Sequence, residues 1–178
     1  MVLNVGEQLV SSYLRYIRKC DFIQTNLYTV EAHGEIDVVG INLKEKQVYI
    51  CEVAIHLTTG LQYVKDKRPN NVQKLTDKFS RDIEYANKYL SEYSRHFMLW
   101  SPLVKDSQGQ ATYNQLGQLD GLNEELGGVE QQLNRDLYGS DFTWVVGEWL
   151  VGHSKPAELM TLERREWGNL RSSLIQWL

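Results

Sequence analysis

The 178-residue chain has few of the features that mark secreted, membrane-spanning or disulfide-built proteins. It has only two cysteines, Cys20 and Cys51, whose spacing fits no metal-ligand pair, and we expect both to be free thiols in a reducing compartment. No apolar run approaches the ~20 residues of a transmembrane helix, and the N-terminus lacks a signal-peptide pattern. The sequence therefore predicts a cytoplasmic protein that does not enter a membrane.

The chain also lacks an excess of positive charge. Its formal net charge of −4 argues against a generic nucleic-acid coat protein, but it leaves room for a local basic groove around an acidic site. Phosphate-binding glycine loops, nucleophile elbows, zinc-binding His-x-x-x-His helices and dinucleotide fingerprints are missing as well. No such catalytic pattern therefore competes with the acidic residues of the chain.

Composition favours a single domain over residues 1–178, because a hydrophobic content of 42% excludes general disorder. We expect a core over about residues 4–104 and a C-terminal extension over about residues 105–178. In the extension, the patterns predict a helix near residues 122–137, a strand or hairpin at DFTWVVGEWLVG, and a terminal helix that begins at Ser154. The apolar residues of that last helix suit either a core or a homodimer contact.

The stretch GEIDVVGINLKEKQVYICEVAIH, residues 34–56, predicts a β-hairpin. A turn centred on Lys44–Glu45 pairs residues whose numbers sum to 89, although a bulge at Gly40 would shift this register by one. The register places Asp37 opposite Glu52, roughly 4.5–5.5 Å apart between Cβ atoms. Because like charges repel at that separation, we expect a protonated acid or a cation between them, and a hard divalent ion suits oxygen ligands.

This hairpin resembles the core of the PD-(D/E)XK nuclease superfamily, in which one strand carries an Asp and the next carries Glu-x-Lys. Asp37, in the letters GEID, matches the Asp, and the letters EVA match Glu-x-Lys with Ala54 in place of the lysine. The resemblance implies an α/β, restriction-endonuclease-like fold with an α-β-β-α-β core and a mixed central sheet flanked by helices. It also implies that Asp37, Glu52 and the Val53 carbonyl bind Mg²⁺ or Mn²⁺.

The segment before the hairpin, NVGEQLVSSYLRYIRK, predicts a helix with Asn4 as its N-cap. Glu7 lies on the apolar stripe of this helix. Its carboxylate either folds back onto the helix N-terminus in a capping box or serves the metal site as a further acid, and the two roles are compatible. The resemblance implies the second role for Glu7, with Glu35 as another possible support.

The segment NVQKLTDKFSRDIEYANKYLSEY, residues 71–93, predicts the best helix in the chain, and RHFMLWSPLV, residues 95–104, predicts a strand that completes the core. Beside the apolar stripe of the helix lies a stripe of cations, which is either a solvated surface or a phosphate-contacting one. In the nuclease interpretation, the residues that contact DNA are Lys78 and Arg81 on the helix and Lys65, Lys67 and Arg68 in the loop before it.

Some nucleases of this superfamily supply the absent lysine from the helix that follows the hairpin. We predict Lys74, in the first turn, for that role, with Lys65 and Lys67 as alternatives. A cation near the metal orients the attacking water or stabilises the pentavalent phosphate. His56, two positions past Ala54, is either a structural residue or a base that positions water.

Together these residues predict a Mg²⁺- or Mn²⁺-dependent nuclease that hydrolyses phosphodiester bonds in duplex or branched DNA. Its catalytic candidates are Asp37, Glu52, Lys74, Glu7 and His56. The alternative is a catalytically degenerate nuclease-fold protein that binds nucleic acid or assembles with proteins, and Ala54 is the feature that favours it. Retention of a repulsive acid pair argues for the enzyme.

Overall fold

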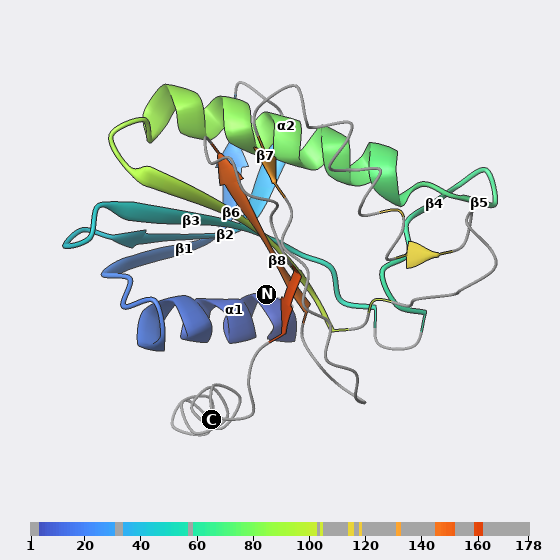
Figure 1. Ribbon diagram of the computed structural model, residues 1–178, viewed down its shortest axis with the longest axis horizontal. Coiled ribbons are helices and arrows are strands. Elements are labelled where there is room, and N and C mark those ends of the chain that lie inside the picture. Colours follow the sequence, from blue (N-terminus) through green and yellow to red (C-terminus); the bar gives the residue numbers. More distant parts are fainter. Residues whose placement is uncertain are drawn as a thin grey trace.

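The computed structural model describes residues 4–30, 34–56, 59–102, 104, 114–115 and 118, and the backbone of three strands within 131–132, 145–151 and 159–161. In these residues the chain forms an α/β structure in which a mixed β-sheet lies between two helices (Figure 1). Within the same ranges, no helix has the length and apolar character needed to cross a membrane.

Helix α1 (Val5–Tyr16) forms where the sequence predicts it. Asn4 is its N-cap, and the side-chain Oδ1 of Asn4 accepts a hydrogen bond from the Gly6 amide at 3.2 Å. The apolar stripe of the helix is buried against the sheet and consists of Leu9, Val10, Tyr13 and Leu14. The predicted helix and its cap are therefore confirmed.

Strands β2 (Gly34–Asn42) and β3 (Gln47–Val53) form the predicted antiparallel hairpin. Val39 pairs with Ile50 and Gly40 pairs with Tyr49, so the numbers of paired residues sum to 89, as predicted. The pairing does not shift at Gly40. Strand β1 (Phe22–Thr29) precedes the hairpin and pairs with β2, so the observed order is α-β-β-β-α-β rather than the expected α-β-β-α-β. Strand β1 was not predicted from the sequence because it lies at the edge of the sheet and its alternate side chains are largely exposed.

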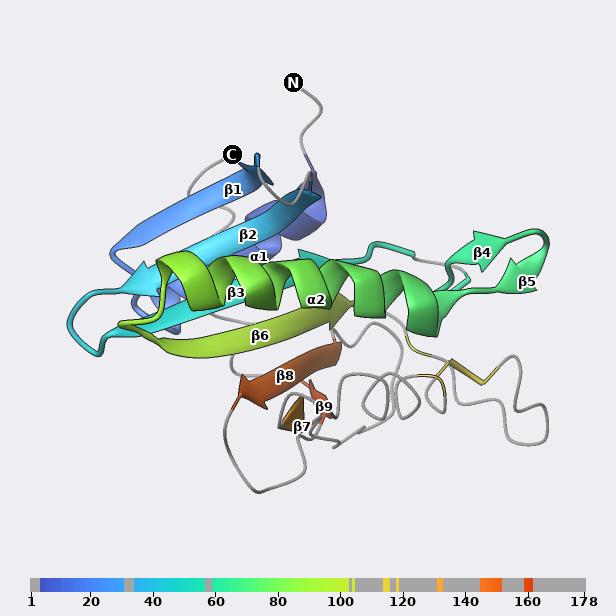
Figure 2. The same ribbon diagram turned by 90° about the horizontal axis from the view of Figure 1, so that it is seen from above.

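Helix α2 (Asn71–Tyr89) and strand β6 (Ser94–Ser101) complete the predicted core, and β6 runs parallel to β3. In Figure 2, α2 lies over β3. The predicted loop before α2 contains a small hairpin of β4 (Val64–Lys65) and β5 (Arg68–Pro69). Its turn residues Asp66 and Lys67 both have positive φ, at 51° and 63°, as a tight hairpin turn requires.

The sheet continues beyond β6 through β8 (Val145–Val151), which confirms the strand within the predicted strand or hairpin over the residues that can be described. Two predicted helices are wrong where they can be checked. Gln131–Gln132 forms strand β7, and Leu159–Thr161 forms strand β9, both paired with β8. Long-range pairing decides these segments, and local periodicity cannot anticipate it. The other parts of these helices, including the predicted dimer contact, lie outside the described residues.

Side chains of β3 alternate between the two faces of the sheet. Val48 and Ile50 pack beneath α2 in the same apolar cluster as Ala54, whereas Tyr49 and Cys51 pack against α1. Cys51 and Cys20 are both buried free thiols, as predicted. The predicted common face of Val48, Ile50 and Ala54 is therefore confirmed, and it is the face that α2 covers.

Candidate functional site

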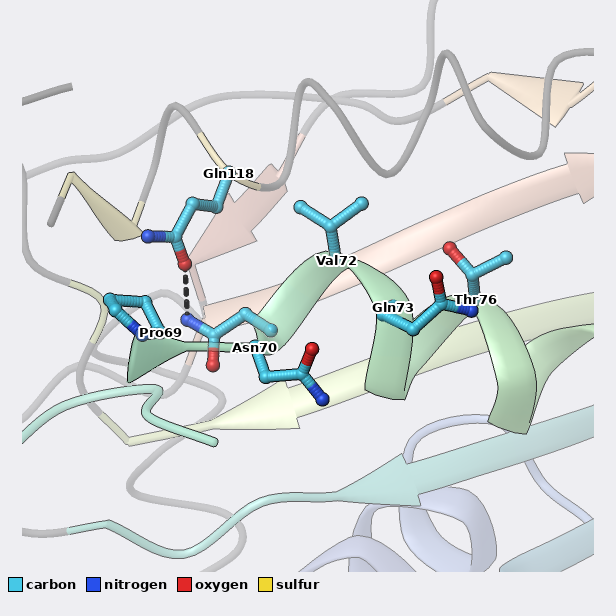
Figure 3. Close-up of a pocket in the computed structure, with 7 residues that line it drawn as sticks. Pro69, Asn70, Val72, Gln73, Thr76 and Gln118 are labelled. Atoms are coloured by element: carbon cyan, nitrogen blue, oxygen red, sulfur yellow. Dashed lines mark hydrogen bonds between the residues drawn. The ribbon is translucent and has the colours of Figure 1, made fainter. Parts of the chain in front are cut away.

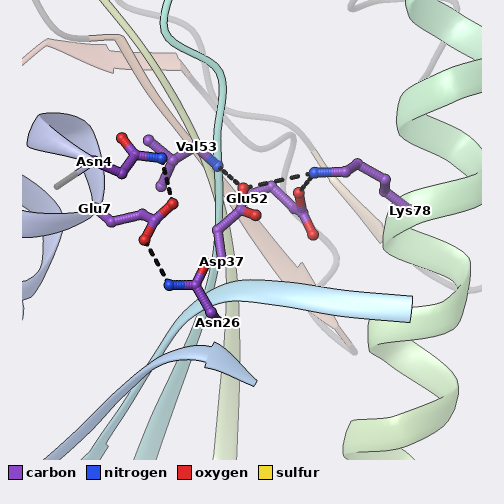
Figure 4. Close-up of polar contacts among 7 residues, drawn as sticks. All are labelled: Asn4, Glu7, Asn26, Asp37, Glu52, Val53 and Lys78. Carbon is purple, nitrogen blue, oxygen red and sulfur yellow. Dashed lines mark hydrogen bonds and ion pairs between the residues drawn. The ribbon is translucent and has the colours of Figure 1, made fainter. Parts of the chain in front are cut away.

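Asp37 and Glu52 lie on neighbouring strands, one step beyond the last ladder pair of the hairpin, Val38 with Cys51. The Oδ2 atom of Asp37 accepts a hydrogen bond from the Val53 amide at 2.7 Å (Figure 4). The Asp37 carboxylate therefore replaces a backbone partner at the strand end, and this contact fixes its position beside Glu52.

A break in the alternation of β2 orients Asp37. Ile36 packs in the cluster beneath α2, whereas Val38 packs in the cluster against α1, although residues two apart in a regular strand share a face. At the matching step of β1, Asn26 has a positive φ of 51°. Both strands are thus irregular at this step, and irregular strand positions often redirect a side chain beside a functional site.

Lys78 extends from α2 to both acids. Its Nζ donates a hydrogen bond to Glu52 Oε2 and lies 3.5 Å from Asp37 Oδ2 (Figure 4). Burial disfavours the charge of Lys78, but the carboxylates of Glu52 and Asp37 outweigh that effect and raise the pKa of Lys78. The ammonium group of Lys78 is therefore the cation that reduces the repulsion between the two carboxylates.

This arrangement corrects the assignment of the lysine. The structure brings Lys78 to the acids, one helical turn after the predicted Lys74, which is exposed. Lys78 itself was expected to contact DNA, yet its side chain turns inward and only 18% of it is exposed. The reason is the path of α2, whose second turn rather than its first lies over Glu52. Position 54 is buried under the same helix.

Asp82 is a fourth member of the site that the sequence did not reveal. It lies one turn after Lys78 on α2, is only 3% exposed, and its carboxyl group is near enough to Glu52 for each to affect the pKa of the other. The signal in the sequence was its position: Asp82 follows Leu75 by seven residues and Phe79 by three, so it falls on the buried stripe of the helix. Its charge alone suggests only a surface residue that offsets the neighbouring cations.

Glu52 and Asp82 form a buried carboxyl pair. Neither Glu52 Oε1 nor Asp82 Oδ2 receives a hydrogen bond from a donor among the described residues. Burial raises the pKa of Glu52, and the negative charges of Asp82 and Asp37 raise it further against the opposing effect of Lys78. Burial also raises the pKa of Asp82. Burial and mutual repulsion therefore favour a proton on this carboxyl pair near neutral pH.

Replacing Asp82 with asparagine should stabilise the protein at neutral and alkaline pH in the presence of a chelator. Folding raises the pKa of Asp82 from 3.8 to about 7, so the folded state holds a proton that the unfolded chain releases. The wild type therefore loses stability as the pH rises through this window, whereas the Asp82→Asn variant lacks the contribution of Asp82 and loses less. We expect the variant to be more stable by about 2 kcal/mol above that window in urea unfolding.

Asp77→Asn is the matched control, because Asp77 is an exposed carboxylate on the same helix. It should change the free energy of unfolding by less than about 0.5 kcal/mol. If wild type and the Asp82→Asn protein lose stability equally as the pH rises, the carboxyl pair does not hold a proton near neutral pH.

Glu7 faces the site from α1. Its Oε1 accepts a hydrogen bond from the Asn4 side-chain amide, and its Oε2 accepts one from Asn26 Nδ2 at 2.9 Å. Burial raises the pKa of Glu7, and the charge of Asp37 adds to that effect. Glu7 therefore combines a contact with the N-cap residue and proximity to Asp37, while Glu35 is exposed at the start of β2.

The remaining predicted residues surround the site at a distance. His56 is half-buried and packs edge-to-face against Tyr63, with 5.7 Å between ring centroids. Burial raises the pKa of Tyr63, and the charges of Lys78 and Glu52 also act on it, which places Tyr63 near the acids. His56 thus has a packing partner in Tyr63, and its predicted role as a base stays a prediction.

The predicted DNA-contacting cations lie on two surfaces. Lys65, Lys67 and Arg68 are exposed on the β4–β5 hairpin. This hairpin leads into a cavity of about 290 Å³ at the start of α2, lined by residues that include Pro69, Thr76 and Gln118 (Figure 3). Arg81 lies against β2, where its guanidinium group packs over Gly34. These cations lie on both sides of Lys78 along the direction of α2.

The donor atoms of the site suit a small divalent cation. Among the described residues, no group of three or more His, Cys, Asp or Glu side chains is arranged to hold a metal ion. Mg²⁺, however, is usually held by one or two carboxylates, with water and substrate phosphate as its other ligands. The buried Glu52 Oε1, which lacks a donor among the same residues, is an oxygen of the required kind. Asp37 and Glu52 therefore supply carboxylate oxygens of the kind that such an ion binds, and the role of the Val53 carbonyl stays a prediction.

Comparison of the chain with protein-family models, curated proteins and solved structures gives no match.

Proposed function

We propose that this protein is a divalent-metal-dependent nuclease that hydrolyses phosphodiester bonds in DNA, with Asp37, Glu52 and Lys78 at its catalytic centre. The observation that carries the proposal is the contact of Lys78 Nζ with both carboxylates. The side chains come from β2, β3 and α2, and together they supply an Asp, a Glu and a Lys. This is the set that the PD-(D/E)XK resemblance implies, with the lysine moved from the strand to the helix.

Each residue has a role that follows from its surroundings. A bound Mg²⁺ or Mn²⁺ supplies Lewis acidity to a phosphate oxygen, and Asp37, Glu52 and the Val53 carbonyl would hold it. Asp37 is kept in place by the Val53 amide, so its carboxylate needs little rearrangement. Because the pKa of Lys78 is raised, this residue stays charged and stabilises negative charge on the phosphate instead of accepting a proton.

Metal binding gives the first test. Isothermal titration calorimetry should detect Mg²⁺ or Mn²⁺ binding to the wild type, and Asp37→Asn or Glu52→Gln should weaken it at least about tenfold, because each removes a charged oxygen ligand. The same two variants should lose cleavage of plasmid DNA. Glu45→Gln, an exposed acid in the hairpin turn, is the control and should bind metal like the wild type. Unchanged binding in both site variants would refute the metal site.

A second candidate function is a nuclease-fold protein without catalysis that binds nucleic acid or other proteins. Two observations favour it: alanine occupies the strand position of the motif lysine, and Lys78 already neutralises the acid pair within the protein. This alternative predicts that wild-type protein cleaves neither DNA nor RNA with Mg²⁺ or Mn²⁺, whereas the proposed function predicts cleavage that a chelator stops.

A further inference from the structure

A groove of about 410 Å³ lies between the end of β1 and the C-terminal half of α2. Tyr28, Tyr85 and Tyr89 line it together with Thr29, Val30, Glu84 and Lys88. Two of its rings are strongly exposed, because Tyr28 keeps 62% and Tyr89 keeps 48% of its surface accessible to solvent. The chain therefore presents a concentrated set of tyrosine rings to solvent outside the acid and lysine cluster.

The chemistry of the groove suits nucleobases. Tyr85 and Tyr89 lie 5.0 Å apart between ring centroids, and the Lys88 ammonium lies 5.1 Å from the centre of the Tyr89 ring. Aromatic rings stack with bases of any sequence, and neighbouring cations attract the phosphates that link those bases. Glu84 repels phosphate but can accept a hydrogen bond from the amino group of a base. A mixed aromatic and cationic surface of this kind matches an unpaired strand better than a purely apolar partner.

The groove is continuous with the acid and lysine cluster along two elements. On α2, Tyr85 follows Lys78 by seven residues, a rise of about 10 Å. On β2, Gly34 precedes Asp37 by three residues, which also spans about 10 Å. Arg81, on α2, links the two elements because its guanidinium group packs over Gly34 of β2. This distance corresponds to roughly three stacked nucleotides, with Arg81 placed to contact the phosphates between them.

We infer that the groove binds the unpaired bases of a single-stranded DNA segment that extends from the duplex next to the cleaved phosphate. This inference rests on the proposed nuclease function and specifies its substrate: DNA with a single-stranded extension or fork rather than a blunt duplex. Tyr28 and Tyr89 stack with bases, and Lys88 and Arg81 contact the backbone.

The test measures binding in the presence of a chelator, so that no cleavage occurs. Fluorescence anisotropy should compare a labelled blunt duplex, the same duplex with a single-stranded extension, and that extension made abasic. Wild-type protein should bind the normal extension at least about fivefold more tightly than the blunt duplex. The double variant Tyr28→Ala, Tyr89→Ala should lose about tenfold in affinity for the extension, equivalent to about 1.4 kcal/mol.

Two controls separate stacking from other effects. Tyr28→Phe with Tyr89→Phe keeps both rings and should bind like the wild type. Phe22→Ala removes an exposed ring at the opposite end of β1 and should also leave binding unchanged. The inference is refuted if the abasic extension binds as well as the normal one, or if the alanine variant binds like the wild type. It is also refuted if sedimentation shows that the alanine variant binds more weakly because it no longer forms a dimer.

Cleavage assays with Mg²⁺ distinguish this inference from the function on which it rests. If wild-type protein cleaves DNA and the alanine variant binds and cleaves every substrate equally well, the groove assignment fails and the nuclease proposal survives. If wild-type protein never cleaves but the alanine variant loses binding to the extension, the nuclease proposal fails and the groove is a nucleic-acid site.

Discussion

Replacing Lys78 with alanine should lower the rate of DNA cleavage by about 10³-fold, the size of loss typical when an enzyme loses a preorganised group that stabilises transition-state charge. Lys78 Nζ contacts both Asp37 and Glu52, which the proposed function places beside the scissile phosphate. The loss should appear in kcat, because the interaction strengthens as charge develops on the phosphate.

Metal affinity separates this role from a merely structural one. The ammonium of Lys78 and a metal ion are two cations drawn to the carboxylates of Asp37 and Glu52, so the Lys78→Ala protein should bind Mg²⁺ at least as tightly as the wild type in calorimetry. Lys74→Ala is the matched control, because Lys74 is exposed one turn earlier on the same helix. It should cleave within about threefold of the wild-type rate. If Lys74→Ala, Lys65→Ala or Lys67→Ala abolishes cleavage and Lys78→Ala does not, the assignment of Lys78 is wrong.

Local patterns in the sequence predicted the parts of the fold that local physics controls. The β2–β3 register followed from β-branched alternation around a polar turn, α1 followed from helical periodicity and its Asn4 cap, and α2 followed from helical periodicity. Strand β1 was not predicted because an edge strand has no continuous buried face. Strand β9 was not predicted because it pairs with β8, and local sequence does not show which distant segments pair.

The residues of the candidate site also fall into those that the sequence could predict and those that it could not. The proximity of Asp37 and Glu52 could be predicted from the register of one hairpin, whereas the break in β2 that orients Asp37 could not. The choice between Lys74 and Lys78 could not, because it depends on where α2 crosses β3, and a change of one turn exchanges the two residues. Asp82 carried a usable signal, since a carboxylate on the buried stripe of a helix needs a partner in the interior.

The position of the lysine can be tested by moving it back to the strand. Ala54 is 3% exposed in the apolar cluster beneath α2, and it shares the face of β3 on which Glu52 lies. In the wild-type background, Ala54→Lys adds volume and a second cation to a filled interior, so we expect it to destabilise the protein by about 3 kcal/mol in urea unfolding.

The same substitution should behave differently once Lys78 has been removed. In the Ala54→Lys, Lys78→Ala double variant, the new ammonium enters space vacated by the old one and meets the same two carboxylates. We expect the double variant to cleave DNA at least about tenfold faster than Lys78→Ala alone, a gain of about 1.4 kcal/mol in transition-state stabilisation. It should also be more stable than the Ala54→Lys single variant, because the lysine at position 54 then has both space and counter-charges.

Ala54→Met, Lys78→Ala is the control for volume, since methionine fills the same space without a charge, and it should not recover cleavage. Recovery with methionine would mean that packing of α2, not the cation, was lost in Lys78→Ala. No recovery with lysine, in a double variant that folds, would mean that the cation must approach from the helix. Wild-type protein can also be compared with a protein that has lysine at position 54. If only the second cleaves nucleic acid, the natural chain has the nuclease fold without its catalysis, because the two proteins differ only in where an ammonium group is placed.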